Sequence, residues 1–173
     1  MIRLAQVNDI KSLPNIERAA DAVFRSEGMA TVADGETMPI PDLLRYQRAG
    51  RAWVDTDEDD RPTAYLLLDV IDGSAHIEQV SVHPSHAGQG MGRQLIETAA
   101  EWAKQQGYAM LTLTTFANVP WNAPYYARLG FEIIPPDHIT PGLREIRQHE
   151  ASAGLDAWPR VIMARTLRNH LNR

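Results

Sequence analysis

The sequence predicts one mixed α/β domain that spans residues 1–173 without an internal linker. Three strand-like segments follow one another between residues 51 and 82, and the short loops between them are typical of an antiparallel meander. After residue 92 the apolar positions change to a helical period, and another strand-like segment follows that helix. A chain of 173 residues has the length of one ordinary domain.

The strands are expected where short apolar or alternating runs are bounded by turn residues. These runs lie at residues 2–4, 51–54, 63–70, 75–82, 109–115, 131–134 and 160–165. The second and third flank an acidic stretch at 55–60, which we interpret as a solvated hairpin loop because it lacks the ligand spacing of a calcium site. The fifth is expected to run parallel to the fourth, since a long helix is the usual crossover between parallel strands.

The helices are placed by their apolar periodicity and by the glycines at their ends. Asn8 is the candidate cap of the first helix, whose apolar residues recur as far as Phe24 and which ends at Gly28. Residues 29–41 have few periodic apolar positions and are expected to form a loop. Later helices are expected near residues 43–47, at 92–107, from 122 to 130 and at 140–153.

Composition and charge exclude several classes of protein. The chain carries 17 basic and 22 acidic residues, for a net charge of −5, and it contains no cysteine. Without cysteine there is no disulfide, thiolate metal site or cysteine nucleophile, which suits a reducing cytoplasm. The acidic balance argues against a nucleic-acid partner. We interpret the arginines near the C-terminus as a solvated strand and tail; they are Arg160, Arg165, Arg168 and Arg173.

Membrane association and metal chemistry also lack a signal in the sequence. No apolar run reaches the roughly 20 residues of a membrane span, and the first residues lack the pattern of a signal peptide. His83 and His86 have no third ligand in a recognisable motif, and Ser81 lacks the Gly-x-Ser-x-Gly turn of a serine nucleophile. We therefore expect a cytoplasmic protein that uses neither a metal nor a membrane.

The most informative segment is a glycine-rich turn between the fourth strand and the long helix. Glycines alternate at Gly88, Gly90 and Gly92, so no side chain keeps a ligand away from the backbone there. The amides of the first helical turn and the helix dipole suit an anion such as a pyrophosphate. The spacing matches neither a Walker A loop nor the dinucleotide fingerprint. The alternative is a tight turn that simply needs glycine conformations.

Two motifs resemble those of the GNAT superfamily of N-acetyltransferases. Val82-His83-Pro84 followed by Gly88-Gln89-Gly90-Met91-Gly92-Arg93 is similar to its acyl-CoA signature. Residues 122–131 are similar to its later motif, in which a tyrosine, here Tyr126, precedes a Gly-Phe pair by four residues. Ala87 departs from the Arg or Gln that usually begins the first motif. We expect this change to weaken CoA binding by about 1–2 kcal/mol, the scale of one charge-assisted hydrogen bond.

The resemblance implies both a fold and a reaction. The implied fold is a mixed, mostly antiparallel sheet of about seven strands, with helices on both faces and a splay between the fourth and fifth strands. The implied reaction moves an acetyl group from acetyl-CoA to a primary amine of a small molecule, or to an exposed protein or peptide amine. The amine attacks directly within a ternary complex, and acetyl-CoA is the cosubstrate.

The resemblance also implies roles for particular residues. Tyr126 matches the acid that protonates the departing thiolate, and Glu78 matches a base that takes the amine proton, with His76 or water as alternatives. The implied contacts to CoA are Val80, Val82, Gly88, Gln89, Gly90, Met91, Gly92, Arg93, Asn118 and Asn122. Structural alternatives exist for three of these side chains: an exposed or salt-bridged Glu78, a packed aromatic Tyr126, and a helix-capping Asn122.

Two other functions are compatible with the sequence. A GNAT-like domain that holds acyl-CoA as a sensor or scaffold needs neither the acid nor the base. A domain that has lost CoA is permitted by Ala87, although the intact glycines argue against it. The sequence does not identify the amine acceptor, the acyl chain or the oligomeric state, so a homodimer stays open. The acidic charge favours a cationic amine.

Overall fold

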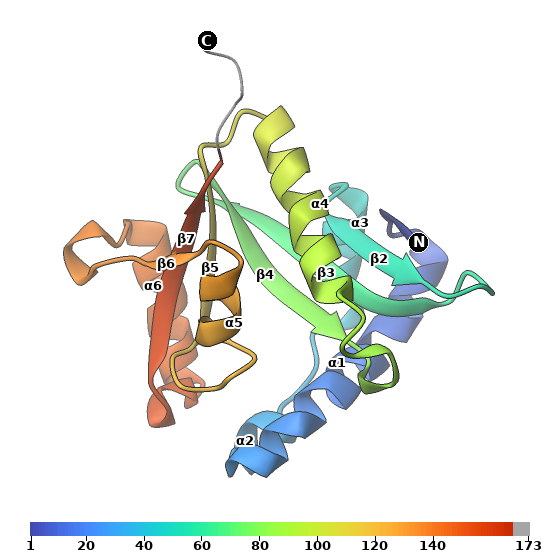
Figure 1. Ribbon diagram of the computed structural model, residues 1–173, viewed down its shortest axis with the longest axis horizontal. Coiled ribbons are helices and arrows are strands. Elements are labelled where there is room, and N and C mark those ends of the chain that lie inside the picture. Colours follow the sequence, from blue (N-terminus) through green and yellow to red (C-terminus); the bar gives the residue numbers. More distant parts are fainter. Residues whose placement is uncertain (168–173) are drawn as a thin grey trace. The chain divides into compact units, whose positions relative to one another are not determined.

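The computed structural model describes residues 1–167 (Figure 1). Arg168 and Arg173, which belong to the expected C-terminal tail, lie outside the described residues. The chain forms a seven-stranded mixed sheet with the strand order β1-β2-β3-β4-β5-β7-β6. Within the described part of the chain, no helix is both long enough and apolar enough to cross a membrane.

The strands lie close to the runs expected from the sequence. They are β1 (Ile2–Leu4), β2 (Ala52–Thr56), β3 (Pro62–Ile71), β4 (Ser74–Val82), β5 (Met110–Phe116), β6 (Glu132–Ile133) and β7 (Arg160–Thr166). Strand β4 pairs in parallel with β5 through Ala75–Leu111 and His76–Thr112, which confirms the expected crossover. Antiparallel pairing joins β1 to β2, β2 to β3, β5 to β7 and β6 to β7.

Six α-helices and five 3-10 helices are present in residues 1–167. The α-helices are α1 (Leu13–Asp21), α2 (Ala30–Ala33), α3 (Ile40–Arg48), α4 (Met91–Gln105), α5 (Ala123–Arg128) and α6 (Pro141–Ser152). The 3-10 helices are η1 (Val7–Ser12), η2 (Ala22–Glu27), η3 (Pro84–His86), η4 (Pro136–His138) and η5 (Leu155–Ala157). The later expected helices are thereby confirmed, whereas the first expected helix is divided into η1, α1 and η2. The long helix α4 begins directly after the glycine turn.

Two local expectations in the N-terminal region are wrong. Asn8 does not cap the first helix, because it lies inside η1, and Gln6 occupies the N-cap position instead. The Asp9 carboxylate accepts a hydrogen bond from the Gln6 backbone N–H at 2.7 Å, which closes that end of η1. The expected loop at 29–41 contains the short helix α2, whose four residues are too few to show a helical period in the sequence.

The chain divides into two compact units. Unit 1 comprises residues 1–69 and 77–99, and unit 2 comprises residues 70–76 and the chain from Ala100 onward. Strand β4 and helix α4 each contribute residues to both units. The expectation of one domain over residues 1–173 stays a prediction.

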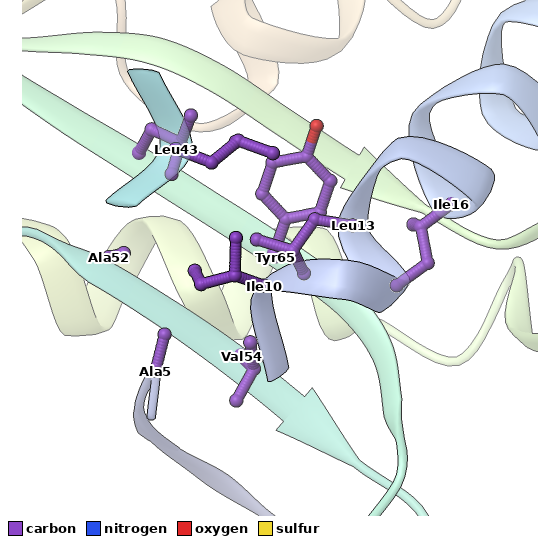
Figure 2. Close-up of a cluster of buried hydrophobic side chains, with 9 residues drawn as sticks. Ala5, Ile10, Leu13, Ile16, Leu43, Ala52, Val54 and Tyr65 are labelled. Carbon is purple, nitrogen blue, oxygen red and sulfur yellow. The ribbon is translucent and has the colours of Figure 1, made fainter. Parts of the chain in front are cut away.

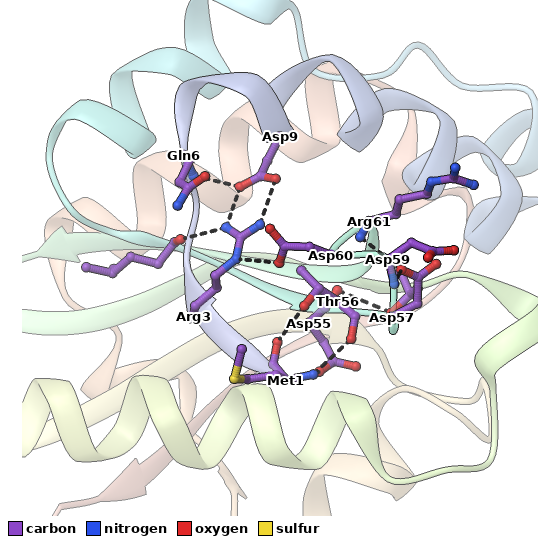
Figure 3. Close-up of polar contacts among 12 residues, drawn as sticks. Met1, Arg3, Gln6, Asp9, Asp55, Thr56, Asp57, Asp59, Asp60 and Arg61 are labelled. Carbon is purple, nitrogen blue, oxygen red and sulfur yellow. Dashed lines mark hydrogen bonds and ion pairs between the residues drawn. The ribbon is translucent and has the colours of Figure 1, made fainter.

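The core of unit 1 is an apolar cluster between the N-terminal helices and strands β2 and β3 (Figure 2). Its members come from distant parts of the sequence and are Ala5, Ile10, Leu13, Ile16, Leu43, Ala52, Val54, Tyr65 and Leu67. Figure 3 shows α4 on the opposite side of these strands from α1. Leu95, Ile96 and Ala99 of α4 are also buried, so helices cover both faces of the sheet in this unit.

Ion pairs hold the edge of unit 1 together (Figure 3). The guanidinium of Arg3 donates to both carboxylate oxygens of Asp9, at 2.7 and 3.1 Å, and to Asp60 at 3.1 Å. Burial alone would raise the pKa of Asp9, but the hydrogen bonds from Arg3 and Gln6 hold it below its ordinary value. The first strand is thereby tied to the 3-10 helix that follows it.

The acidic hairpin loop is solvated, as expected, at residues 57–60, whereas residues 55 and 56 are buried at the end of β2. Asp57 accepts hydrogen bonds from the backbone N–H groups of Asp59 and Arg61, each at 2.9 Å, and residues 57–60 are exposed. Asp55, in contrast, is buried in β2, and its carboxylate lies 2.9 Å from the amino nitrogen of Met1. A buried carboxylate needs such a partner, and the sequence pattern did not reveal it.

In unit 2, a polar network joins helix α6 to strands β5 and β7. Glu150 of α6 accepts hydrogen bonds from the Thr114 hydroxyl at 2.6 Å and from Arg160 at 2.8 Å. Arg147 donates to the other oxygen of Glu150 at 2.9 Å. The Arg160 guanidinium also lies over the ring of Phe116, 4.3 Å from its centroid. The network therefore has a structural role in placing α6. The expectation of a solvated Arg160 is wrong, because its side chain is 8% exposed.

Candidate functional site

The glycine turn has the backbone geometry that an anion site requires. Gly88 and Gly90 both have φ of +77°, in the left-handed region that residues with a side chain rarely adopt. A Cβ at either position would meet no atom within 4 Å, so the backbone conformation, and not crowding, requires glycine here. The turn is exposed, which leaves its backbone accessible to a ligand.

The first amides of α4 follow directly from this turn. The Gln94 N–H donates to the Gly90 carbonyl at 3.0 Å, which is an i to i−4 bond at the start of the helix. The N–H groups of Met91, Gly92 and Arg93 precede that bond and have no acceptor within the helix. Together with the positive end of the helix dipole, they form a set of donors suited to a phosphate.

Contacts to strand β3 hold the glycine turn in place within unit 1. The His83 N–H donates to the Thr63 carbonyl at 2.9 Å, and the Thr63 hydroxyl lies 3.9 Å from the sulfur of Met91. Between these points, Ser85 Oγ lies 2.7 Å from Nδ1 of His83 and 2.9 Å from Nδ1 of His86. The side chains of both histidines therefore make hydrogen bonds within the turn itself. No group of three metal-ligating side chains occurs within residues 1–167.

Strand β4 carries the two candidates for the base in different environments. Glu78 is exposed, whereas His76 is 1% exposed. Nδ1 of His76 lies 2.8 Å from the Thr112 hydroxyl, on the neighbouring strand of unit 2. A buried imidazole with this contact favours a structural role for His76. Glu78 is accessible to solvent, as a base must be to exchange its proton. Val80 and Val82 are half-buried on the same strand.

Tyr126 lies on α5 in unit 2 and is 9% exposed. Its ring packs edge-on against Tyr125 and Phe131, with centroids 5.4 and 5.9 Å away. Gly130, with φ of +91°, ends the helix and lets the chain turn so that the Phe131 N–H reaches the Tyr126 carbonyl at 3.1 Å. The Gly-Phe pair of the motif therefore has a physical purpose, because it packs an aromatic ring against the tyrosine.

Burial, and to a lesser degree the neighbouring Tyr125, raises the pKa of Tyr126 above its ordinary value. The phenol is therefore protonated at neutral pH. A protonated hydroxyl is the form that a general acid needs.

The two asparagines after β5 differ in their environments. Asn122 occupies the N-cap position of α5, but its side chain makes no capping hydrogen bond, so the helix-cap alternative is wrong. Its Nδ2 donates to the Trp121 carbonyl at 3.2 Å, and its Oδ1 is buried without a hydrogen-bond partner in the described residues. Such an acceptor is suited to a donor from a ligand. Asn118 is exposed.

Each unit groups part of the predicted site. In unit 1, Glu78, Val80, Val82 and the segment from Gly88 to Arg93 lie along one strand and the turn that follows it. In unit 2, Asn118, Asn122 and Tyr126 lie within ten residues after β5. Unit 1 also contains a group that was not expected from the sequence, formed by Glu17, Asp21 and Tyr65. The four-residue spacing of the two acids on one helix was the signal that could have indicated it.

The family model for the acetyltransferase (GNAT) family matches residues 18–131, which is more than half of the chain. The chain therefore belongs to the GNAT family of acetyltransferases.

One relative and two solved structures extend this result. The uncharacterized N-acetyltransferase YobR of Bacillus subtilis is 32% identical over 76 residues, which cover 44% of this chain and 31% of that protein. The matched part thus spans less than a third of the relative's length. The PaiA N-acetyltransferase of Thermoplasma acidophilum, solved with coenzyme A, superposes with a TM-score of 0.68 at 14% identity, covering 96% of this chain and 98% of that one.

The ribosomal-protein-S18-alanine N-acetyltransferase of Escherichia coli superposes with a TM-score of 0.65 at 18% identity, covering 100% of this chain and 98% of that one. At these identities the two structures establish the fold. They confirm the mixed GNAT-like α/β architecture expected from the sequence.

Proposed function

We propose that this chain is an N-acetyltransferase that moves an acetyl group from acetyl-CoA to a primary amine, either of a small molecule or of an exposed peptide or protein. The observation that carries the proposal is the exposed turn at Gly88 and Gly90, whose left-handed backbone leads into the first amides of α4. Its position directly after β4, within the matched family motif, supports pyrophosphate as its ligand.

The chain's own groups supply each step of a direct attack. The exposed carboxylate of Glu78 takes a proton from the ammonium group, directly or through water, to leave the neutral amine. Backbone amides of β4 near Val80 and Val82 hold the pantetheine arm and polarise the thioester carbonyl. Tyr126 donates its phenolic proton to the departing thiolate and is reprotonated by the second proton that the attacking nitrogen loses. The new C–N bond replaces the C–S bond, and the products are the amide, the CoA thiol and one proton.

The remaining contacts are assigned from chemistry and position. Amides from Gly88 to Arg93 hold the pyrophosphate, with Gln89 and Met91 contributing through their backbone. The buried Oδ1 of Asn122 accepts a hydrogen bond from an amide N–H or amino group of CoA, and Asn118 contributes a further polar contact. These roles need no metal.

The test combines binding with turnover on the same protein. Acetyl-CoA is titrated into the purified chain by calorimetry, and release of the CoA thiol is then followed with a panel of amines. We expect saturable binding that weakens with salt, and thiol release that depends on the amine. Binding without thiol release from any amine would identify an acyl-CoA sensor or scaffold. Absence of binding would overturn both functions.

We further propose that the protein works in the cytoplasm, because a chain without cysteine suits a reducing compartment. A net charge of −5 supports a cationic acceptor over a nucleic acid. Fractionation of cells locates the protein, and sedimentation of the purified chain decides between a monomer and the homodimer that the sequence leaves open.

A further inference from the structure

Two carboxylates lie together on helix α1 in unit 1. Glu17 and Asp21 are four residues apart, which places them on one face of the helix, one turn from each other. Both side chains are half-buried. Within residues 1–167 neither carboxylate makes an ion pair, although Arg18 contributes positive charge near Glu17 and the Met38 N–H donates to it at 3.1 Å. Two adjacent acids with so little compensation are unfavourable by themselves.

A buried hydroxyl group faces the same two acids. Tyr65 of β3 is 1% exposed, and its ring forms part of the apolar cluster of unit 1. Its hydroxyl points away from that cluster (Figure 2) and has no hydrogen-bond partner at normal distance in the described residues. Glu17, Ser81 and Asp21 are nevertheless near enough to act on the pKa of Tyr65, which burial raises above its ordinary value. The hydroxyl therefore lies within electrostatic reach of both carboxylates, and only weak interactions with Glu17 and Ser81, short of a hydrogen bond of normal geometry, satisfy it.

An orphaned hydroxyl at this depth is costly, and most such groups in native proteins have a partner. A cation with several N–H donors would satisfy all three groups together. An ammonium group carries three donors, which matches two carboxylates and one phenolic oxygen. It would also neutralise the repulsion between Glu17 and Asp21.

We propose that Glu17, Asp21 and Tyr65 bind an ammonium group of the acceptor, and that the acceptor is a small amine with at least two ammonium groups. This inference rests on the proposed acetyltransferase function. The bound ammonium is the one that does not react. Carboxylates favour the charged form of an amine, whereas the attacking nitrogen has to lose its proton. A diamine satisfies both requirements, because one end stays charged at the cluster and the other end is free to become neutral.

The test compares 1,4-diaminobutane with 1-aminobutane, which has the same carbon chain and lacks the second ammonium. Binding of each amine to the full chain is measured by calorimetry, without turnover, and kcat and KM are measured with acetyl-CoA. We expect the wild type to bind the diamine at least tenfold more tightly. Glu17→Gln and Asp21→Asn should each remove most of that difference. The exposed Glu27→Gln, on the segment that follows α1, is the matched control and should leave it unchanged.

Tyr65→Phe separates ligand binding from folding. Within residues 1–167 the hydroxyl makes no hydrogen bond of normal geometry, so its removal should not lower the melting temperature, while diamine affinity should fall several-fold. A lower melting temperature with unchanged diamine affinity would overturn the role of Tyr65. This variant keeps the proposal testable even if a carboxylate variant folds poorly.

Failure of this inference and failure of the proposed function give different results. Equal affinity of the wild type for the two amines, together with thiol release from other amines, would overturn the cation site and leave the acetyltransferase standing. Selective diamine binding without thiol release from any amine would overturn the acetyltransferase and support the cation site. A peptide amine acetylated with a higher kcat/KM than the diamine would overturn the assignment to a small acceptor.

Discussion

The phenol of Tyr46 donates a hydrogen bond to a carboxylate oxygen of Asp69, with 2.7 Å between the two oxygens. Burial raises the pKa of Tyr46 above its ordinary value, and the charges of Asp69 and Glu78 act in the same direction. Tyr46 therefore stays protonated, and its single proton is committed to Asp69. Glu78, the proposed base, stands near this pair within unit 1.

Glu78→Gln tests the base. The amide cannot take a proton, so the variant should bind acetyl-CoA normally and turn over more slowly. The loss should be smallest at high pH, where the amine is already neutral. General base catalysis is typically worth about 10²- to 10⁴-fold in rate. The measurement is the pH profile of thiol release.

Tyr46→Phe is the comparison variant for the base. It keeps Glu78 and removes one hydrogen bond, at a cost in stability of about 1 kcal/mol. If Tyr46→Phe slows turnover as much as Glu78→Gln does, turnover depends on the hydrogen bond between Tyr46 and Asp69. The carboxylate of Glu78 is then not the base.

Gly90→Val tests the proposed phosphate site. Valine resists the φ of +77° at this position and brings a branched side chain to the face of the turn, so CoA affinity should fall at least tenfold. Gly50→Val is the control, since Gly50 also has a positive φ, of +69°, and open space around it. Both variants should lose similar stability, and only Gly90→Val should lose CoA binding by calorimetry. If Gly90→Val and Gly50→Val bound CoA with equal affinity, the glycine turn would not be part of the CoA site.

Tyr126→Phe tests the acid. The ring contacts with Tyr125 and Phe131 survive the change, so thermal stability should stay close to that of the wild type. Acetyl transfer should fall by around two orders of magnitude, the range of general acid catalysis, while CoA affinity changes by no more than a few-fold. The rate is measured where chemistry limits turnover. Near-normal turnover would show that water protonates the thiolate.

Asp21→Asn tests the unsatisfied acidic pair through the pH dependence of stability. Burial, with a contribution from Glu17, raises the pKa of Asp21 from 3.8 to about 7. Between these two values the native state holds a proton that the unfolded chain releases, so the free energy of unfolding should fall as pH rises from about 4 to 7. Above that window the contribution of Asp21 no longer changes.

The Asn variant has no proton to lose at this position. Its urea unfolding midpoint should therefore vary less with pH across the window and should exceed that of the wild type at pH 8. Glu17 also has a pKa raised by burial and contributes in the same direction, so some slope remains in the variant. An unchanged slope would mean that Asp21 is ionised throughout this range.

The sequence by itself determined the parts of this protein that depend on neighbouring residues. The period of the apolar positions placed α4, and the alternating glycines placed the turn before it, because helical spacing and positive φ are local properties. The motif around Tyr126 was likewise visible, since Gly130 and Phe131 act on a tyrosine only a few residues away. Family membership followed from these local patterns.

The tertiary structure alone decided which residues meet across long stretches of chain. It placed β7 between β5 and β6, buried Asp55, and ruled out the alternative of a helix-capping side chain for Asn122. It also brought the Tyr65 hydroxyl to Glu17 and Asp21, from strand β3 to helix α1. Strand pairing and burial depend on packing between distant segments, so composition and spacing carry no signal for them. The proposed acceptor site arises from such packing, whereas the proposed phosphate site arises from a continuous run of sequence.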